Sequence, residues 1–211
     1  MTSINFQNQV AFVTGTNKKN GIGRAIVHAL LEQGAKKVYA TARDASQLED
    51  LVSEHQGKVV AVQLDVTDTE AIQKLPTLYP DVTMVVNNAG YFGQIENSLT
   101  NDMESVQREM QVNYIAPLAI VAAFAPLLQK QASGDSAVVN IASIASLVNF
   151  PLGGTYSASK AAAHSLTQAQ RRDLPESLVI GVYPGPIDTE MAAGIEMDKA
   201  SPSDVAGAVV K

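Results

Sequence analysis

The chain has 211 residues with a formal net charge of −6, of which 46% are hydrophobic and 17% charged, and it has no cysteine. This length fits a single domain, expected over residues 1–211, and the ordinary balance of apolar and charged residues excludes a disordered chain. The negative charge argues against a nucleic-acid-binding face, and the lack of cysteine excludes disulfides and thiolate metal sites.

The first nine residues are polar and lack the basic and apolar regions of a signal peptide. No apolar run is expected to approach the roughly 20 residues that are needed to cross a bilayer. The composition therefore predicts a cytoplasmic protein that binds neither nucleic acid nor a membrane.

Short β-branched runs alternate with longer amphipathic segments along the whole chain. Strands are expected at residues 10–14, 37–42, 59–64, 82–87, 137–141 and 178–183. Helices are expected at residues 21–33, 45–53, 68–75, 102–130, 156–173 and 201–211, with a kink or break at Pro117. Because apolar strands separated by helices form parallel sheets covered on both faces, the predicted fold is an α/β, Rossmann-type, doubly wound sheet.

The first strand and the first helix are joined by a glycine-rich loop between Thr14 and Gly23. Its glycines permit a tight turn and let backbone N–H groups approach a pyrophosphate, whose charge the helix N-terminus favours. The position between a hydrophobic strand and a helix favours nucleotide binding over an ordinary turn. The candidate contacts in this loop are Gly15, Asn17, Lys18, Gly21, Ile22 and Gly23.

The end of the second strand indicates which dinucleotide is bound. An NAD site places a carboxylate there for the ribose 2′-hydroxyl, whereas this chain has Arg43. A guanidinium pairs with a 2′-phosphate, so the expected cofactor is NADP(H). Asp44 is expected to cap the following helix. Lys18 and Lys19 either add positive charge near the phosphate or belong to a solvated loop.

Two residues of the later chain are spaced for acid–base chemistry. Tyr156 and Lys160 are four residues apart, so they share one face of the predicted helix. A phenol has a pKa of about 10, and a neighbouring ammonium favours its ionised form, so Lys160 is expected to lower the pKa of Tyr156. Ser143 follows a strand at the carboxyl edge, where its hydroxyl can hydrogen-bond a substrate oxygen.

The motifs occur together in one order along nearly the whole chain. They are the loop at 14–23, Leu64-Asp65-Val66, Asn87-Asn88-Ala89-Gly90, Val112-Asn113, Asn140 to Ser143, Tyr156 to Lys160, Pro184-Gly185 and Thr189. Because of these motifs, the chain resembles the short-chain dehydrogenases/reductases. This resemblance implies hydride transfer between NADP(H) and a carbonyl or secondary alcohol.

The resemblance also implies a role for each catalytic residue. Tyr156 is the general acid or base, Lys160 lowers its pKa and holds the nicotinamide ribose, Ser143 orients the substrate, and Asn113 places a water for proton relay. Further cofactor contacts implied are Asp65, Val66, Asn88, Ala89, Gly90, Tyr156, Lys160, Pro184, Gly185, Ile187 and Thr189. The implied substrate pocket is apolar and is lined by Ile144, Leu152 and Tyr183.

Other residue patterns add no second site. His28, His55 and His164 lie in separate segments without a ligand partner at metal-binding spacing, so no metal is expected. The glycine loop is two residues longer than the family pattern. Because the chain ends at Lys211, the sheet is expected to lack the last strand of the family.

Two other functions stay open besides the carbonyl reductase or alcohol dehydrogenase. A 3-oxoacyl thioester reductase would need a basic patch for an acidic carrier protein, and the 15 Lys and Arg residues give no obvious one. A non-catalytic dinucleotide sensor of the same fold has no need of the proton relay, although the early chain end favours it. A homodimer is expected through the helices at 102–130 and 156–173, with a small carbonyl or alcohol as the other partner.

Overall fold

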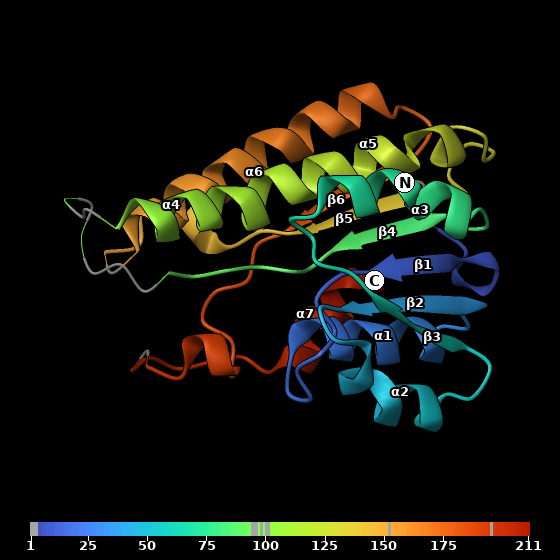
Figure 1. Cartoon of the computed structure of the whole chain (residues 1–211), viewed down its shortest axis with the longest axis horizontal. Helices are drawn as coiled ribbons and strands as arrows, with labels where there is room; N and C mark the ends of the chain where they lie inside the picture. The colour runs from blue at the N-terminus through green and yellow to red at the C-terminus, as the bar shows by residue number, and fades with distance from the viewer. Residues whose placement is uncertain (1–3, 94–96, 98, 100–101, 152, 195) are drawn as a thin grey trace.

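Six apolar runs of the chain form one parallel sheet, which Figure 1 shows between two layers of helices. The structure, a computed structural model, describes residues 4–93, 97, 99, 102–151, 153–194 and 196–211. The strands are β1 (Val10–Val13), β2 (Lys37–Ala42), β3 (Val59–Gln63), β4 (Met84–Asn87), β5 (Ala137–Ile141) and β6 (Leu178–Val182). Their order is β3-β2-β1-β4-β5-β6, and β6 is the last strand in the described part of the chain. This confirms the predicted doubly wound α/β fold.

The helices follow the predicted segments closely. They are α1 (Ile22–Glu32), α2 (Glu49–Glu54), α3 (Thr69–Leu78), α4 (Met103–Met110), α5 (Ala116–Leu128), α6 (Gly154–Asp173) and α7 (Pro202–Val209). Short 3-10 turns are η1 (Phe6–Asn8), η2 (Ala45–Leu48), η4 (Ile144–Ser146) and η5 (Glu190–Ala192). Asp44 caps η2, because its side chain accepts a hydrogen bond from the backbone N–H of Ser46, as the sequence predicts.

Alternate residues of the central strand pack on opposite faces of the sheet. Ala11 and Val13 lie in a core with α1, α2 and α7, whereas Val10 and Phe12 lie in a second core with α3 and α5. Figure 1 shows α4, α5 and α6 on one side of the sheet and α1, α2 and α7 on the other. Strands that are buried on both faces explain the continuous apolar runs of the sequence.

The long helix expected at 102–130 consists of α4 and α5, joined by a π-helical segment, η3 (Gln111–Ile115). Pro117 lies in the first turn of α5 and has no N–H to give to the carbonyl of Asn113, so the widened turn lies where the sequence predicts a break.

This combined helix corrects the expectation that no apolar run is long enough to span a bilayer. Residues Met103–Leu128 contain an 18-residue window of mean hydropathy 1.6, which is apolar enough for a membrane span by length and composition alone. Core helices of water-soluble proteins meet the same criterion. Here Ile120, Phe124 and Leu128 are buried against the sheet.

Candidate active site

A cleft of about 940 Å³ lies at the carboxyl ends of the strands. Its walls come from the loops after β1, β2, β3, β4 and β5 and from residues 184–192. Chain connections run in opposite directions from β1 and β4, so the cleft lies at the switch point where doubly wound sheets bind ligands. Every residue predicted to contact the cofactor lines it.

The glycine loop is shaped by close backbone approach. Gly15 has φ of +70°, and a Cβ there would lie 2.8 Å from the Cα of Ala89. A Cβ on Gly23 would lie 2.5 Å from the carbonyl oxygen of Gly15 and would overlap the side chain of Asn88. Only glycine fits at these two positions. Helix α1 begins at Ile22 without a side-chain cap, so its first N–H groups can bind a phosphate.

Two side chains hold this loop in place. The side-chain amide of Asn88 donates to the carbonyls of Thr14 and Gly15 at 2.8 and 2.9 Å. The hydroxyl oxygen of Thr14 accepts from the backbone N–H groups of Asn88 and Ala89, both at 3.0 Å. Asn88 therefore supports the loop as well as lining the cleft, and Thr14 is a structural residue that the sequence analysis did not single out.

Both lysines of the lengthened loop have acidic partners. Lys18 lines the cleft and pairs with Glu190 at 2.5 Å. Lys19 pairs with Asp50 at 3.2 Å and is not part of the cleft wall. Asn20 donates to the carbonyl of Asp188 at 2.9 Å, so the loop contacts the segment 188–190 at two points.

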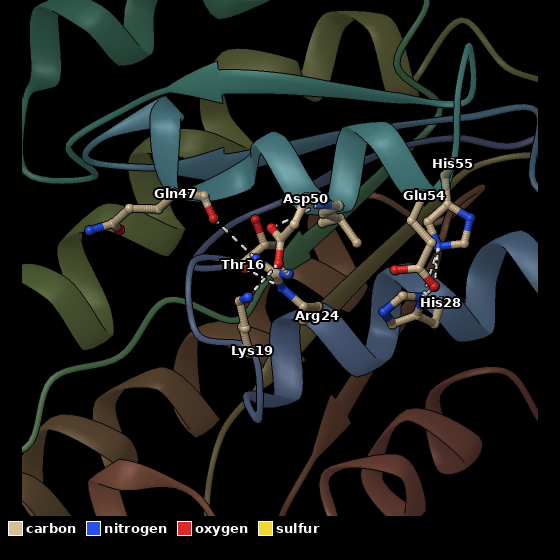
Figure 2. A network of polar contacts seen from close by, with 9 residues as sticks. Thr16, Lys19, Arg24, His28, Gln47, Asp50, Glu54 and His55 are labelled. Carbon is tan, nitrogen blue, oxygen red and sulfur yellow. Dashed lines mark hydrogen bonds and ion pairs between the residues drawn. The ribbon is translucent and has the colours of Figure 1, made fainter.

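Asp50 joins this loop to the helices behind it. Arg24 pairs with it at 2.7 Å, and Figure 2 shows Arg24 and Lys19 converging on its carboxylate. The hydrogen bond from Arg24, with a further one from Lys19, holds the pKa of Asp50 well below its ordinary value. Lys19 therefore belongs to an ion-pair network outside the cleft wall. This position favours a solvated loop lysine over a lysine that contacts the cofactor phosphate.

The expected adenosine end of the cleft carries opposite charges. Arg43, directly after β2, is exposed and has no ion pair within the described ranges. Asp65, beyond β3, accepts hydrogen bonds from the backbone N–H and the hydroxyl of Thr67 at 2.9 and 2.7 Å. The bond from the Thr67 N–H is the main cause of the lowered pKa of Asp65, and the charge of Arg43 lowers it further.

Three of the four predicted catalytic residues lie in the same cleft. Ser143 lies two residues after the end of β5, and Tyr156 and Lys160 lie one turn apart on α6. The ammonium of Lys160 donates to the carbonyl of Ile141 at 3.0 Å and lies 5.7 Å from the centre of the Tyr156 ring. The structure therefore brings a hydroxyl, a phenol and a buried ammonium to one wall of the cleft.

Burial dominates the protonation of this group. It raises the pKa of Tyr156 from 10.0 to about 12, a hydrogen bond with Ser143 opposes the rise, and the charge of Glu109 adds to it. Burial also lowers the pKa of Lys160 from 10.5 to about 8. The pKa of Tyr156 thus moves opposite to the expected direction, because loss of hydration outweighs the ammonium 5.7 Å away.

Asn113 lies behind the cleft wall. It is 2% exposed, in η3, and its amide is engaged by protein groups. Its oxygen accepts from the N–H of Tyr91 at 2.9 Å, and its nitrogen donates to the carbonyl of Tyr91 at 2.8 Å and the hydroxyl of Ser159 at 2.9 Å. The side chain therefore ties the loop after β4 to α6, and its expected role in placing a water stays a prediction.

The three residues predicted to line the substrate pocket differ in where they lie. Ile144 lines the cleft and is 46% exposed, whereas Leu152 lies outside the described residues. Tyr183 does not line the cleft: its ring folds back over Gly181, and its hydroxyl hydrogen-bonds Nδ1 of His164 at 2.7 Å. The assignment of Tyr183 to the pocket was therefore wrong.

Two phenylalanines that line the cleft, Phe92 and Phe150, were missed by the sequence analysis, and Met191 lines the cleft as well. The ring of Phe92 lies 5.1 Å from that of Tyr156, between centroids. Its place two residues after the Asn-Asn-Ala-Gly turn was the available signal, since that turn brings the chain out of β4 directly at the cleft.

Two histidines from separate segments of the chain are neighbours in the structure. Nδ1 of His28 and Nε2 of His55 lie 2.8 Å apart, with Glu54 beside both, although 27 residues separate them in sequence. The parallel packing of α1 and α2 brings them together away from the cleft. The prediction that these histidines have no partner at ligand distance was wrong.

Comparison with known proteins agrees with this geometry. The profile described as short chain dehydrogenase matches residues 9–200. An uncharacterized oxidoreductase of Staphylococcus saprophyticus is 31% identical over 221 residues, which cover 98% of this chain and 92% of the relative.

Two solved structures are also similar. A short-chain dehydrogenase of Burkholderia cenocepacia in complex with NADP is 36% identical, with a TM-score of 0.88 over 97% of this chain and 84% of that one. A short-chain dehydrogenase/reductase of Burkholderia phymatum in complex with NAD has a TM-score of 0.84 over 96% of this chain and 84% of that one. At 24% identity, the second likeness supports the fold alone.

A parallel sheet in this strand order, with a glycine loop at its switch point and a Ser–Tyr–Lys group in the same cleft, defines a class of nucleotide-binding oxidoreductases. The chain belongs to the short-chain dehydrogenase family, whose profile covers nearly its whole length.

Proposed function

We propose that this protein is an NADP(H)-dependent oxidoreductase that interconverts a carbonyl compound and a secondary alcohol. The observation that carries the proposal is the convergence of Ser143, Tyr156 and Lys160 in the cleft that the glycine loop also lines. A non-catalytic nucleotide sensor has no use for a buried ammonium, which costs folding free energy.

The cleft fits a dinucleotide on its own geometry. Because Gly15 and Gly23 have no side chain, the loop packs closely against Ala89 and Asn88, and the uncapped first turn of α1 lines the cleft where a pyrophosphate would bind. Arg43 supports NADP(H), because its guanidinium lacks an ion pair in the described part of the chain and can bind a 2′-phosphate. The NADP complex of the Burkholderia cenocepacia relative supports the same choice, although another protein of this fold is solved with NAD.

In this proposal the dinucleotide supplies the hydride, and the protein supplies position, charge and a proton. Tyr156 is protonated at neutral pH, because burial raises its pKa to about 12, so its phenol can donate a proton to a carbonyl oxygen. Ser143 can donate a second hydrogen bond to that oxygen as its charge grows. Lys160 places a positive charge 5.7 Å from the centre of the Tyr156 ring.

The proposed substrate is a hydrophobic ketone or aldehyde. Ile144, Phe92, Phe150 and Met191 line the cleft with apolar surface, and the ring of Phe92 lies 5.1 Å from that of Tyr156. Such a pocket favours an apolar carbonyl compound over a charged one, because a charged group would lose its hydration there.

We further propose a homodimer through α4, α5 and α6. Ile115, at the end of η3, and Leu118, Ala122 and Pro126 of α5 recur every three or four residues and are all exposed, so they form an apolar stripe along one face of this helix. The exposed residues of α6 include Ala158 and Ala161, whose small side chains permit close helix approach.

The test of the catalytic proposal is oxidation of NADPH, and separately of NADH, followed at 340 nm with a panel of apolar ketones and aldehydes. We expect turnover with NADPH and a loss of about 10²-fold to 10⁴-fold in Tyr156→Phe, because that change removes only the proton donor. Tyr79→Phe, outside the cleft, is the matched control and should keep wild-type activity. Undiminished turnover in Tyr156→Phe would contradict the assignment. Binding of NADPH without turnover of any carbonyl would favour the sensor.

A further inference from the structure

A second cluster of potential ligands lies away from the cleft, where α1 faces α2. His28 is on α1, Glu54 is the last residue of α2, and His55 caps that helix. Figure 2 shows the three side chains pointing toward one another, and none of them lines the cleft.

The distances within the cluster match a tetrahedral metal site. Nδ1 of His28 and Nε2 of His55 are 2.8 Å apart, and an oxygen of Glu54 lies 3.9 and 3.8 Å from these two nitrogens. With bonds of about 2.1 Å, the ligand atoms of a tetrahedral zinc ion lie about 3.4 Å apart. The two nitrogens must therefore move apart by about 0.6 Å and the carboxylate oxygen must approach by about 0.4–0.5 Å, so that a metal ion replaces the hydrogen bond between the rings.

The chemistry and exposure of the three groups also suit a metal. Two imidazole nitrogens and one carboxylate are the donor set of zinc sites that keep a fourth position for water. The side chains of His28, Glu54 and His55 are 33%, 60% and 22% exposed, so an ion can enter from solvent without unfolding the protein. The partial burial of the two rings limits their freedom to turn away.

The two helices are already held together beside this cluster. Arg24 and His28 are one turn apart on α1, and Asp50 and Glu54 are one turn apart on α2. The ion pair between Arg24 and Asp50, at 2.7 Å, therefore fixes the distance between the helices one turn from the histidines (Figure 2). Ligands that are positioned before binding lose less conformational entropy when the metal binds.

We propose that His28, Glu54 and His55 bind one divalent transition-metal ion, for which Zn²⁺ is the best fit, with water as the fourth ligand. The ion joins α1 to the end of α2 and acts as a structural link. This site is separate from the catalytic proposal, because it requires neither a bound nucleotide nor the cleft.

The test is a titration of chelator-treated, untagged full-length protein with CoCl₂, because tetrahedral Co²⁺ has a strong visible absorption, followed by displacement with ZnCl₂. We expect saturation at one equivalent. His28→Gln and His55→Gln should each weaken binding by about tenfold or more, and Glu54→Gln should weaken it less. The chain has three histidines, and His164→Gln is the matched control that should change the affinity less than about twofold.

A second measurement separates loss of the ligand from loss of the fold. The urea midpoint of the wild-type protein and of His164→Gln should rise with added ZnCl₂, because an ion that binds only the folded state stabilises it. The double variant His28→Gln/His55→Gln should show the circular dichroism of the metal-free wild type and no rise. Binding that does not saturate, or equal affinity in the double variant, would overturn the proposal and leave only a hydrogen bond between two imidazoles.

Discussion

Arg43 stands at the end of β2 with its guanidinium exposed at the rim of the cleft. A 2′-phosphate bound there would receive charge-assisted hydrogen bonds, which contribute about 1.5–3 kcal/mol each. We therefore expect Arg43→Leu to reduce kcat/KM for NADPH about tenfold to a hundredfold, which such a free energy implies. The value for NADH should change less than about twofold, since it lacks that phosphate.

The matched control for this charge is Arg172→Leu. Arg172 is also exposed but lies near the end of α6, paired with Asp173 and outside the cleft. Steady-state kinetics with both cofactors checks the prediction. A parallel fall of NADPH and NADH activity in Arg43→Leu would show that the arginine supports the loop and does not select the cofactor.

Lys160 combines a catalytic position with a cost in stability. Burial lowers its pKa from 10.5 to about 8, so holding the ammonium charged in the fold at pH 7 costs about 3 kcal/mol, at about 1.4 kcal/mol per pH unit. We expect Lys160→Met to raise the free energy of unfolding by about 2 kcal/mol at pH 7, the rest being lost with the hydrogen bond to Ile141. Turnover should be lost.

The pH dependence of this gain identifies its cause. Between about pH 8 and pH 10.5, Lys160 is protonated in the unfolded chain and largely deprotonated in the folded chain. The free energy of unfolding of the wild type therefore rises with pH over this range because of Lys160. The advantage of Lys160→Met should therefore be full below pH 8 and shrink as the pH rises toward 10.5. Urea unfolding at pH 7 and pH 10 measures both values. A variant that is less stable than the wild type at pH 7 would show that the lysine is stabilising.

At the scale of single elements, the first turn of α1 depends on the absence of a side chain. A Cβ on Gly23 would lie 2.5 Å from the carbonyl oxygen of Gly15, so Gly23→Ala must push the loop away from α1. We expect a loss of about 1–3 kcal/mol in stability from this overpacking. NADPH binding, measured by fluorescence, should weaken about tenfold or more, since phosphate binding needs the close backbone.

Gly207 in α7 is the control for this substitution. A Cβ there meets nothing within 4 Å, so Gly207→Ala should stabilise the fold by about 0.5–1 kcal/mol through helix propensity. It should leave NADPH affinity unchanged. Equal NADPH affinity in Gly23→Ala and the wild type would show that the glycine loop does not bind the cofactor.

The secondary-structure elements and the cleft residues were predictable where they depend on residues that are close together in the sequence. The strands β2 and β5 begin and end where the apolar runs predict, and Tyr156 and Lys160 share a helix face as their spacing requires. The pairing of His28 with His55 and the direction of the Tyr183 ring were not predictable. Both depend on how distant segments pack, through α1 against α2 and through the space left by Gly181. The pKa of Tyr156 was misjudged because burial, unlike spacing, is not visible in a sequence.

At the scale of the whole molecule, the apolar stripe on α5 calls for a partner surface. Leu118 lies in it and is 41% exposed. We expect Leu118→Glu to convert the proposed dimer into monomers, because it would place like charges at the centre of a two-fold interface. Light scattering at micromolar concentration measures the mass. Leu78→Glu, on α3 and 62% exposed, is the matched control and should not change it. A wild-type protein that is already monomeric would rule the dimer out.

The order of the sheet also bears on how the chain is made. The apolar window within residues 103–128 leaves the ribosome after β1, β2, β3 and β4, which are neighbours in the finished sheet. Val10 and Phe12 of β1 and Val85 of β4 belong to the core that buries Ile120 and Phe124. Strands that precede this helix in the chain therefore supply part of the surface that buries it, so the helix can begin to pack before β5 and β6, which supply Val138 and Val179, are synthesised.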